Sequence, residues 1–351
     1  MWSPGVLRPA LALLALLAGA WLAEAADRAA APEVYEWQLP RGFPPPAVPA
    51  DNPMTPEKVS LGRLLFYEPR LSISRRQACG TCHNQSLAFT DGKARAIGAT
   101  GEPHPRSAMS LANVAYSPVY TWTDAGFSSL EAQVLQPLLN EHPVEMGLKG
   151  RESAVLSELE SDGRYREAFA RAFPQERDPL TMANLARALA SFERTLISGR
   201  SAFDRYVFDD ERTALDAPAK RGMGLFFSER IGCSQCHFGL NFSGPIVHAR
   251  ATQANPAFVN TGAGRFRVPT LRNVAVTAPY MHDGAVSTLA EVLDLYATTG
   301  RGHPATPAES ADRDQRLRPF ALSSVEKEEL LGFLASLTDE EFLGDSRFAP
   351  P

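Results

Sequence analysis

Cys79-Gly80-Thr81-Cys82-His83 is the stretch that decides the fold, and its pattern returns at Cys233-Ser234-Gln235-Cys236-His237. Two cysteines separated by two residues and followed directly by histidine form the attachment signature of c-type haem. Each thiol adds to one vinyl group of the porphyrin, which places the histidine under the iron. One copy could be an accident or half of a zinc site, but two copies use all 4 cysteines of the 351-residue chain. The sequence therefore predicts two covalently bound haems c, with His83 and His237 as proximal iron ligands.

Residues 1–25 have the features of a secretory signal peptide. Arg8 supplies a short positive region, an apolar run extends from Leu11 to Leu22, and Ala23-Glu24-Ala25 is a small-x-small cleavage site. The apolar run is shorter than the roughly 20 residues that span a bilayer, although an uncleaved anchor is the alternative reading. We expect a periplasmic mature chain without a membrane span, which agrees with haem attachment outside the cytoplasm.

The charge and the spacing of the motifs bound the organisation of the chain. A net charge of −5 gives no basic footprint for nucleic acid or for an anionic membrane surface. We predict a proline-rich extended arm over residues 26–54. Two cytochrome c-like domains with one haem each follow, over residues 55–214 and 215–340.

Helical periodicity dominates the rest of the sequence, and no strand-like alternation extends beyond a few residues. Thr55, Thr181 and Ser323 precede apolar-periodic runs as candidate helix caps, the last with Glu326 in a capping box. The fold class is therefore predicted as all-α with long loops. The expected helices start near 56, 130, 152, 164, 182, 215, 288 and 324.

Two haems alone do not define an enzyme. An electron carrier needs two strong axial ligands on each iron, whereas a peroxidase needs one open iron face with polar groups that handle protons. The methionines outside the signal do not lie in an obvious ligand loop of a cytochrome c. They are Met54, Met109, Met146, Met182, Met223 and Met281.

Several motifs together resemble one family. They are Leu61-Gly62-Arg63-Leu64-Leu65-Phe66, the first haem motif, Arg267-Val268-Pro269-Thr270-Leu271-Arg272-Asn273 and Thr277-Ala278-Pro279-Tyr280-Met281-His282-Asp283-Gly284. This combination resembles the bacterial dihaem cytochrome c peroxidases and MauG, over about residues 55 to 338. The resemblance implies an enzyme that uses hydrogen peroxide.

The resemblance also implies the ligands of the second haem. Classical peroxidases carry an axial methionine fourteen residues beyond the histidine that corresponds to His282, and MauG carries a tyrosine there. This chain has Tyr296 at that place. Tyr296 shares a helical face with Leu289, Val292 and Leu293, so the alternative is a core tyrosine whose hydroxyl bonds elsewhere. As an anionic ligand, a phenolate favours ferric and higher oxidation states, and so a high-valent dihaem state.

The distal side of the first haem is expected between residues 130 and 146. Gln133 and Pro137 match the Gln-x-x-x-Pro pattern of MauG-like pockets, and Glu145 matches the catalytic glutamate that moves protons on peroxide. Gln133 and Glu145 are twelve positions apart, which is two more than in the family. Glu141 and His142 are nearby competitors, and a solvent-exposed position is the alternative for a lone glutamate.

Further residues receive roles only through the resemblance. Trp122 corresponds to a tryptophan between the two haems, and its alternative is ordinary packing in a core. Asn113 and the main-chain oxygens of Thr277 and Pro279 correspond to a calcium site between the haems. His104 lies where classical peroxidases carry a histidine that blocks the resting haem, and exposure to solvent is its alternative.

Two connecting segments, residues 36–46 and 99–111, resemble the MbnH-type enzymes within this superfamily. These enzymes oxidise tryptophan in a copper-binding partner protein to kynurenine. We therefore expect a periplasmic dihaem enzyme that uses hydrogen peroxide to oxidise a partner protein. The alternatives are a classical cytochrome c peroxidase supplied by a small electron-transfer protein, and a dihaem electron carrier without enzymatic activity.

Overall fold

The computed structural model describes residues 33–123, 126–244, 258–261, 264–300 and 314–351. The chain forms one unit over Met1–Glu36 and a second over Trp37–Pro351. Residues 33–36 carry no helix or strand, and the predicted signal peptide lies outside the described residues. None of the helices in the described part of the chain has the length and apolar character needed to cross a membrane.

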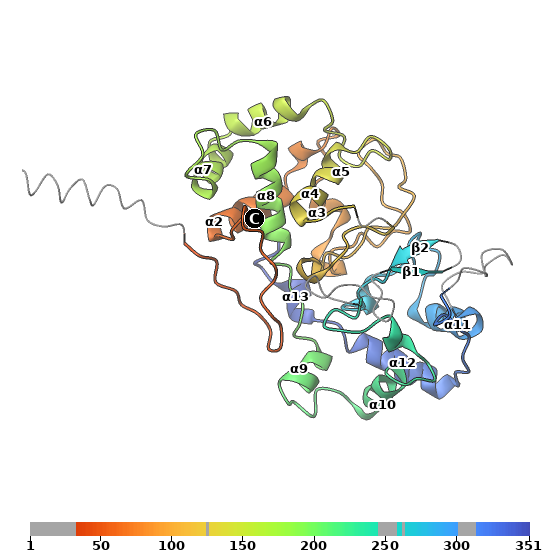
Figure 1. Ribbon diagram of the computed structural model, residues 1–351. Coiled ribbons are helices and arrows are strands. Elements are labelled where there is room, and N and C mark those ends of the chain that lie inside the picture. Colours follow the sequence, from red (N-terminus) through yellow and green to blue (C-terminus); the bar gives the residue numbers. More distant parts are fainter. Residues whose placement is uncertain (1–32, 124–125, 245–257, 262–263, 301–313) are drawn as a thin grey trace, which may run out of the picture. The chain divides into compact units, whose positions relative to one another are not determined.

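Helices make up most of the regular structure, which confirms the predicted helical class (Figure 1). They are α2 (Pro56–Phe66), α3 (Cys79–Cys82), α4 (Leu130–Gln133), α5 (Leu135–Leu139), α6 (Glu152–Ser161), α7 (Gly163–Ala172), α8 (Met182–Glu193), α9 (Ala202–Phe208), α10 (Ala217–Phe226), α11 (Leu289–Thr299), α12 (Ser324–Ala335) and α13 (Glu340–Gly344). Two three-residue strands, β1 (Phe258–Asn260) and β2 (Arg265–Arg267), pair antiparallel. These strands and helices α9 and α13 were not predicted, because they are too short to show a period in the sequence.

The longer helices begin where cap residues satisfy their first free N–H groups. Each cap side-chain oxygen accepts a hydrogen bond from the main-chain N–H three residues later, which confirms the predicted helix starts. The cap residues are Thr55 of α2, Thr181 of α8, Thr288 of α11 and Ser323 of α12. The last two form full capping boxes with a glutamate.

The two halves of the chain repeat one helix pairing. Helix α2 packs on α8, and α10 packs on α12. A glycine lies at each contact: a Cβ on Gly62 would be 2.0 Å from the Ala188 oxygen, and a Cβ on Gly222 would be 1.8 Å from the Glu329 oxygen. Only glycine permits so close an approach between two helix backbones. In each half, the helix before the haem motif is thereby held against the closing helix.

An asparagine turn is also repeated. Asn113 and Asn273 have left-handed backbones, with φ of 59° and 60°, and each precedes a short 3-10 turn. The N–H of Asn113 donates to the Leu196 oxygen at 2.8 Å, and that of Asn273 donates to the Leu337 oxygen at 3.0 Å. Each turn therefore binds the segment that follows its own closing helix. These repeats fit a duplicated unit, while the predicted domain boundary at 214/215 stays a prediction.

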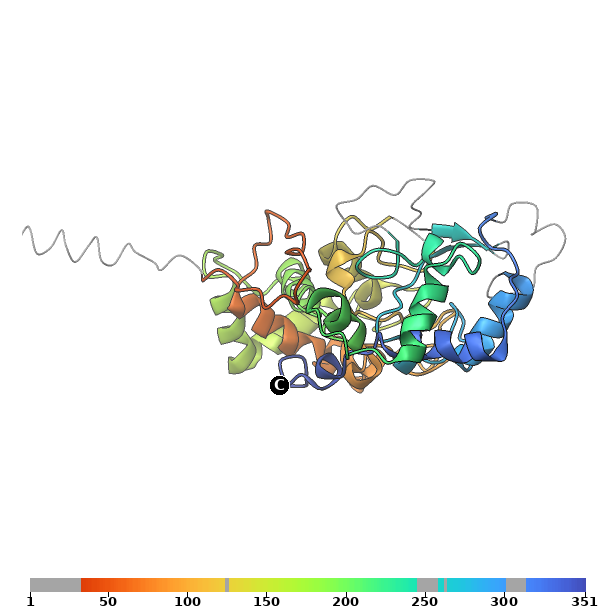
Figure 2. The same cartoon turned by 90° about the horizontal axis from the view of Figure 1, so that it is seen from below.

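Two hydrophobic cores match the two helix pairs. One is centred on α2 and α8, and the other on the aromatic cluster Phe203, Phe226, Phe242 and Phe333. The C-terminal segment returns to the first core, where Phe342 and Phe348 are buried. Both views place the C-terminus beside α2 (Figure 1, Figure 2), where the Arg63 Nε donates to the Ala349 oxygen at 2.7 Å.

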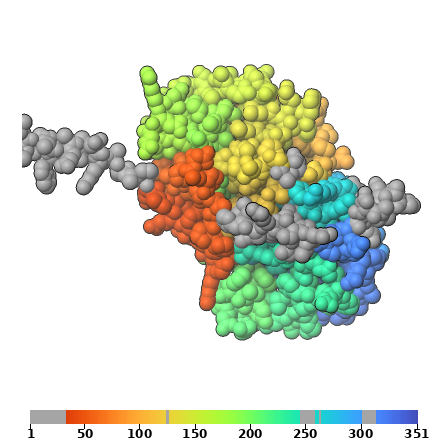
Figure 3. All heavy atoms as spheres, in the orientation of Figure 1, coloured from red at the N-terminus to blue at the C-terminus, as the bar shows by residue number. Residues whose placement is uncertain are grey.

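The proline-rich segment joins the two halves through residues 37–54, which have no helix or strand. Its Phe43 is buried, with its ring edge-on to Tyr116 and Phe208. The Arg272 guanidinium lies 5.0 Å from the Phe43 ring centre and forms a buried ion pair with Asp204 at 2.8 Å. In Figure 3 the segment's red atoms lie at the surface beside green atoms from the middle of the chain. The predicted extended arm is thus a strap with one aromatic anchor.

The close helix contact in the second half makes a direct prediction. Gly222→Ala should lower the free energy of unfolding by roughly 1–3 kcal/mol, because the added methyl meets the backbone of α12. Gly224 lies on the same helix with no atom within 4 Å of its added Cβ. Gly224→Ala should be neutral, or stabilising by about 0.5–1 kcal/mol. Denaturant unfolding of the holoprotein measures both, and equal effects would contradict the packing argument.

Candidate active site

The first haem motif forms a single helical turn that aims His83. The His83 N–H donates to the Cys79 oxygen at 2.9 Å, which closes the turn. The ring Nδ1 lies 2.8 Å from the Phe89 oxygen. A carbonyl can only accept, so Nδ1 carries the proton and Nε2 keeps a lone pair for a metal. Burial lowers the pKa of His83, which favours this neutral form.

The second motif repeats these contacts. The His237 N–H donates to the Cys233 oxygen at 2.9 Å, and its Nδ1 donates to the Phe242 oxygen at 2.9 Å. Phe89 and Phe242 both have left-handed backbones, with φ of 61° and 49°. Both histidines are therefore held in the same tautomer by the same kind of bend.

The carbonyl-bearing loops are anchored by equivalent hydroxyls. The Ser110 Oγ donates to the Ala88 oxygen at 2.6 Å, and the Thr270 Oγ1 donates to the Asn241 oxygen at 2.7 Å. The accepting residues directly precede the two phenylalanines whose carbonyls bind the histidines. The chain thus contains two equivalent histidine sites. We call each one a seat: a CxxCH motif together with the phenylalanine carbonyl that binds its histidine.

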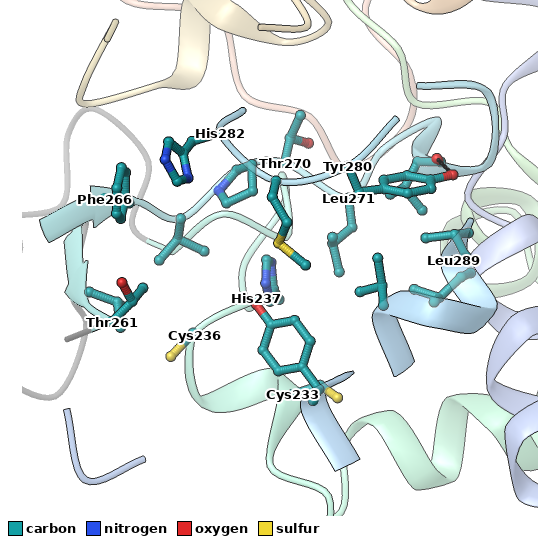
Figure 4. Close-up of a pocket in the computed structure, with 18 of the residues that line it drawn as sticks. Cys233, Cys236, His237, Thr261, Phe266, Thr270, Leu271, Tyr280, His282 and Leu289 are labelled. Atoms are coloured by element: carbon teal, nitrogen blue, oxygen red, sulfur yellow. Dashed lines mark hydrogen bonds between the residues drawn. The ribbon is translucent and has the colours of Figure 1, made fainter. Parts of the chain in front are cut away.

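A cavity of about 290 Å³ adjoins the second motif. His237 projects between the sulfurs of Cys233 and Cys236, with Phe266 and His282 toward one end and Leu289 toward the other (Figure 4). Tyr296 also lines this cavity, so the structure brings together the four residues predicted for the second haem.

Tyr296 is an enclosed tyrosine of this cavity. Burial, followed by the nearby Cys236 and Cys233 thiols, raises its pKa to about 12. Within the described residues its hydroxyl has no hydrogen-bond partner, unlike the hydroxyls of Tyr67, Tyr116, Tyr165 and Tyr280. The alternative of a core tyrosine bonded elsewhere therefore loses its support. A phenolic oxygen aimed into a cavity beside a histidine suits a metal ligand.

Arg267 lines the same cavity and was not predicted as a site residue. It is 7% exposed, and burial lowers its pKa to about 10. Its side chain donates to the Met109 sulfur at 3.7 Å and has no carboxylate partner in the part of the chain that the structure describes. A buried, unpaired guanidinium is costly, so the cavity calls for an anionic group.

These features fit a haem. The paired thiols match the two vinyl groups, His237 and Tyr296 offer one nitrogen and one oxygen to an iron, and Arg267 offers a cation to a propionate. The lining is otherwise mostly apolar, as a porphyrin requires. The first seat offers the equivalent residues, Cys79, Cys82 and His83, to the other haem.

Glu145 lies beside the first motif: burial is the main cause that raises the pKa of both cysteine thiols, and the Glu145 carboxylate adds a small contribution. The Met146 N–H donates to the Pro137 oxygen at 2.9 Å, which brings Glu145 next to Pro137 despite the two extra residues. Glu141 and His142, in the turn before Glu145, are exposed. Burial raises the pKa of Glu145 to about 7, which suits a group that both accepts and gives a proton.

Gln133 lies one turn before Pro137, at the end of α4. Gln133 is half-buried. Val134 continues the helical backbone from α4 into α5, so Gln133 and Pro137, four residues apart, share a helix face. The predicted set of Gln133, Pro137 and Glu145 therefore lies on one continuous segment.

Trp122 lies where the two halves meet. Its Nε1 donates to the Ser107 oxygen at 3.0 Å, and its own oxygen accepts from the Arg267 N–H at 2.8 Å. The ring lines the second cavity, and Ser107 is two residues from Met109, whose backbone contacts the His83 ring. This position fits a residue between two haems.

The residues predicted for calcium all lie in the described part of the chain. Asn113 is fully buried, and both atoms of its side-chain amide bond to the main chain of Ser198, at 2.7 and 2.8 Å. Thr277 and Pro279 line the second cavity. Within the described residues, no group of three or more His, Cys, Asp or Glu side chains could hold a metal ion. The calcium site stays a prediction.

Comparisons with known proteins agree with this geometry. Residues 56–212 match the family model described as di-haem cytochrome c peroxidase. The methylamine utilization protein MauG of Methylorubrum extorquens is 36% identical over 301 residues, covering 83% of this chain and 81% of that protein. The chain belongs to the MauG and dihaem cytochrome c peroxidase superfamily.

Two further matches bear on its activity. The cytochrome c551 peroxidase of Pseudomonas aeruginosa is 32% identical over 271 residues, 73% of this chain and 76% of that protein. A crystal structure of a MauG-like protein associated with microbial copper homeostasis superposes with a TM-score of 0.83 at 36% identity. It covers 90% of this chain and 99% of that one. The chain is thus an enzyme, a peroxidase-like oxidoreductase with two haem cofactors.

The role of Arg267 can be tested against its neighbour on the same strand, Arg265, which is exposed. Arg267→Met should lower the midpoint potential of one haem, because a nearby positive charge favours the ferrous state. The expected shift is on the order of 1–2 kcal/mol, or roughly 40–90 mV for one electron. Arg265→Met should leave both potentials unchanged. Spectroelectrochemical titration measures them, and equal effects of the two substitutions would contradict the assignment.

Proposed function

We propose that this chain is a periplasmic enzyme that uses hydrogen peroxide to oxidise a partner protein. Its N-terminal segment directs export and is removed, and each CxxCH motif binds one haem covalently. A bound haem with an open iron face supplies the two-electron cleavage of peroxide. The protein residues position the reactants, move the protons and tune the second haem.

The first seat handles peroxide. Glu145 would take a proton from one oxygen of hydrogen peroxide and return it to the other oxygen, which leaves as water. Its pKa of about 7 allows both steps near neutral pH. Gln133 and Pro137 line this side, and the Pro137 oxygen holds the Glu145 segment in place through the Met146 N–H.

The second seat stores oxidising charge. The observation that carries this proposal is the position of the Tyr296 hydroxyl. Its hydroxyl lies in one cavity with His237 and has no hydrogen-bond partner within the described residues. A phenolate ligand stabilises the more oxidised iron, in contrast to the methionine of a carrier haem. Trp122, which bonds to Ser107 and Arg267, is the proposed relay that passes electrons between the two haems.

The proposed substrate is a tryptophan of a copper-binding partner protein, converted to kynurenine. Two molecules of hydrogen peroxide supply two oxygen atoms and four oxidising equivalents, giving N-formylkynurenine and two waters. Hydrolysis then releases formate and leaves kynurenine. The similarity to a MauG-like protein associated with copper homeostasis supports this partner class.

One observation favours a second candidate, a classical cytochrome c peroxidase supplied by a small electron-transfer protein. Met109 and Met281 also line the second cavity, so a thioether is available there. The Met109 sulfur already accepts from Arg267, which leaves Met281 as the competing ligand.

The two candidates predict different ligands on the second iron. Tyr296→Phe should convert one ferric haem from six- to five-coordinate, and should raise its potential because an anionic ligand is lost. A rise on the order of 100 mV is expected, within the ~0.8 V that axial ligands span. Met281→Leu should leave the spectrum and the potential unchanged. A spectral change with Met281→Leu alone would support the classical peroxidase.

The substrate prediction is tested with the partner itself. Hydrogen peroxide is added to the ferric holoenzyme with and without a copper-binding protein encoded beside it, and tryptic peptides of that protein are analysed by mass spectrometry. A tryptophan peptide should appear with the mass of its kynurenine form only when enzyme and peroxide are both present. An unmodified partner, together with rapid turnover of reduced cytochrome c, would contradict the proposal.

A further inference from the structure

The two seats differ in how their bends are closed. In the first seat, the Leu87 oxygen accepts from the Thr90 N–H at 3.1 Å and from the Thr90 Oγ1 at 2.8 Å. The equivalent oxygen of the second seat belongs to Leu240, which also lies two residues before the phenylalanine, and it accepts from the Arg272 Nε at 2.8 Å. The first bend is therefore closed by its own loop, whereas the second is held by a side chain 32 residues away.

Arg272 also departs from the repeat that relates the two halves. It directly precedes Asn273, the asparagine of the second turn. In the first half, Ala112 directly precedes Asn113. Both positions are buried, with Arg272 1% exposed and Ala112 2% exposed. The second half thus carries a buried cation where the first half carries a methyl group.

Further contacts hold the guanidinium of Arg272. Its Nη1 donates to the Asp204 Oδ2 at 2.8 Å, in an ion pair whose side chains are 1% and 2% exposed. Its central carbon lies 5.0 Å from the Phe43 ring centre and 5.8 Å from the Phe242 ring centre, within the range of cation–π attraction. One cation therefore joins the strap, helix α9 and the bend of the second seat.

The Phe43 ring is itself fixed from several sides. It lies edge-on to Tyr116 and to Phe208, the last residue of α9. The Tyr116 hydroxyl donates to the Pro44 oxygen at 2.7 Å, which holds the strap next to the ring. A Cβ on Gly199 would lie 2.4 Å from the Phe43 ring, so the main chain passes directly against it. The strap thus presents a rigid aromatic face to Arg272.

Stability alone does not account for the buried ion pair. Removing two charges from water offsets most of their attraction, so apolar side chains of similar size would stabilise the fold equally well. An arginine differs from an apolar residue in that its planar fork can bond two acceptors at fixed angles. Here the acceptors are the Asp204 carboxylate and the Leu240 oxygen. The ion pair therefore orients the guanidinium toward the bend.

We propose that Phe43, Asp204 and Arg272 form a clamp that holds the proximal histidine of the second haem. Arg272 is the positioning residue of this clamp and acts on the iron through His237. The inference rests on one part of the proposed function, which is His237 as an iron ligand. It gives the strap a role beyond folding, because an N-terminal segment then helps to set the potential of the C-terminal haem.

The clamp reaches the iron ligand through the main chain of the bend. Arg272 holds the Leu240 oxygen, and two residues later the Phe242 oxygen accepts from the His237 Nδ1 at 2.9 Å. This donation makes the imidazole a more basic ligand, which stabilises ferric iron. A bend without its clamp would weaken the hydrogen bond and favour the ferrous state. Since the first half has Ala112 at the equivalent position, this control acts on the second haem.

The paired substitution Arg272→Met/Asp204→Asn removes the clamp without leaving an unpaired buried charge. The net charge of the chain stays the same, so a shift in potential reports the lost hydrogen bond. One midpoint potential should rise by about a tenfold change in its oxidation equilibrium, or 59 mV for one electron, and the other should stay. Spectroelectrochemical titration of the holoprotein measures both. Two unchanged potentials would overturn the proposal.

The part of the strap is tested with two matched phenylalanines. Phe43 is 7% exposed and Phe348 is 6% exposed, and each is a buried anchor of a segment near one end of the chain. Phe43→Leu and Phe348→Leu should both lower the denaturant midpoint of unfolding. Only Phe43→Leu should also raise the potential that the paired substitution raises, by a smaller amount. Equal shifts from both would show a general effect of lost packing, and the clamp would fail.

Tyr296→Phe separates this inference from the rest of the proposed function. If Tyr296→Phe changes its haem as expected while the paired substitution and Phe43→Leu change neither potential, only the clamp fails. If Tyr296→Phe leaves the spectrum and the potentials unchanged, the assignment of Tyr296 as a ligand fails. A rise shared by the paired substitution and Phe43→Leu would still support the clamp in that case.

Discussion

The site depends on one hydrogen bond that occurs twice: a histidine Nδ1–H donates to the carbonyl of a phenylalanine in a left-handed bend. At 2.8 Å from Phe89 and 2.9 Å from Phe242, the two bonds fix the tautomer and the ring orientation of His83 and His237. Each bend is held by a hydroxyl, and each hydroxyl lies just before an asparagine turn that binds the end of the closing helix. The contacts of Gly62 and Gly222 hold the helix before each haem motif against that closing helix. The positions of His83 and His237 are thus determined by packing outside the two CxxCH motifs.

Equivalent seats then receive different surroundings. The first faces Glu145, whose segment is pinned by the Pro137 carbonyl and the loop of His104. The second faces Tyr296, a phenol without a hydrogen-bond partner in the described part of the chain. Between them, Trp122 and the backbone of Arg267 join loops from both halves. The repeated arrangement offers two sites for a haem, and the proposed function assigns proton transfer to one and storage of oxidising charge to the other.

The sequence predicted what local physics determines. Helix starts at Thr55, Thr181 and Ser323 were visible because a cap and an apolar period lie within a few residues of each other. The pocket position of Tyr296 followed from helical periodicity and a family resemblance. The burial of Arg267 and the 3.5 Å approach of the His104 Nε2 to the Glu145 Oε1 were not visible, because both depend on contacts between segments distant in sequence. The anchor Phe43 and the C-terminal return of Phe348 to the first core likewise have no local signal.

A crystal structure of the ferric holoenzyme would show directly which groups face each iron. We expect the Tyr296 oxygen on the iron bound to His237. We also expect an open face on the iron bound to His83, with the Glu145 carboxylate above it and the His104 imidazole behind that carboxylate. A thioether of Met281 on the second iron, or the His104 nitrogen on the first, would contradict these assignments.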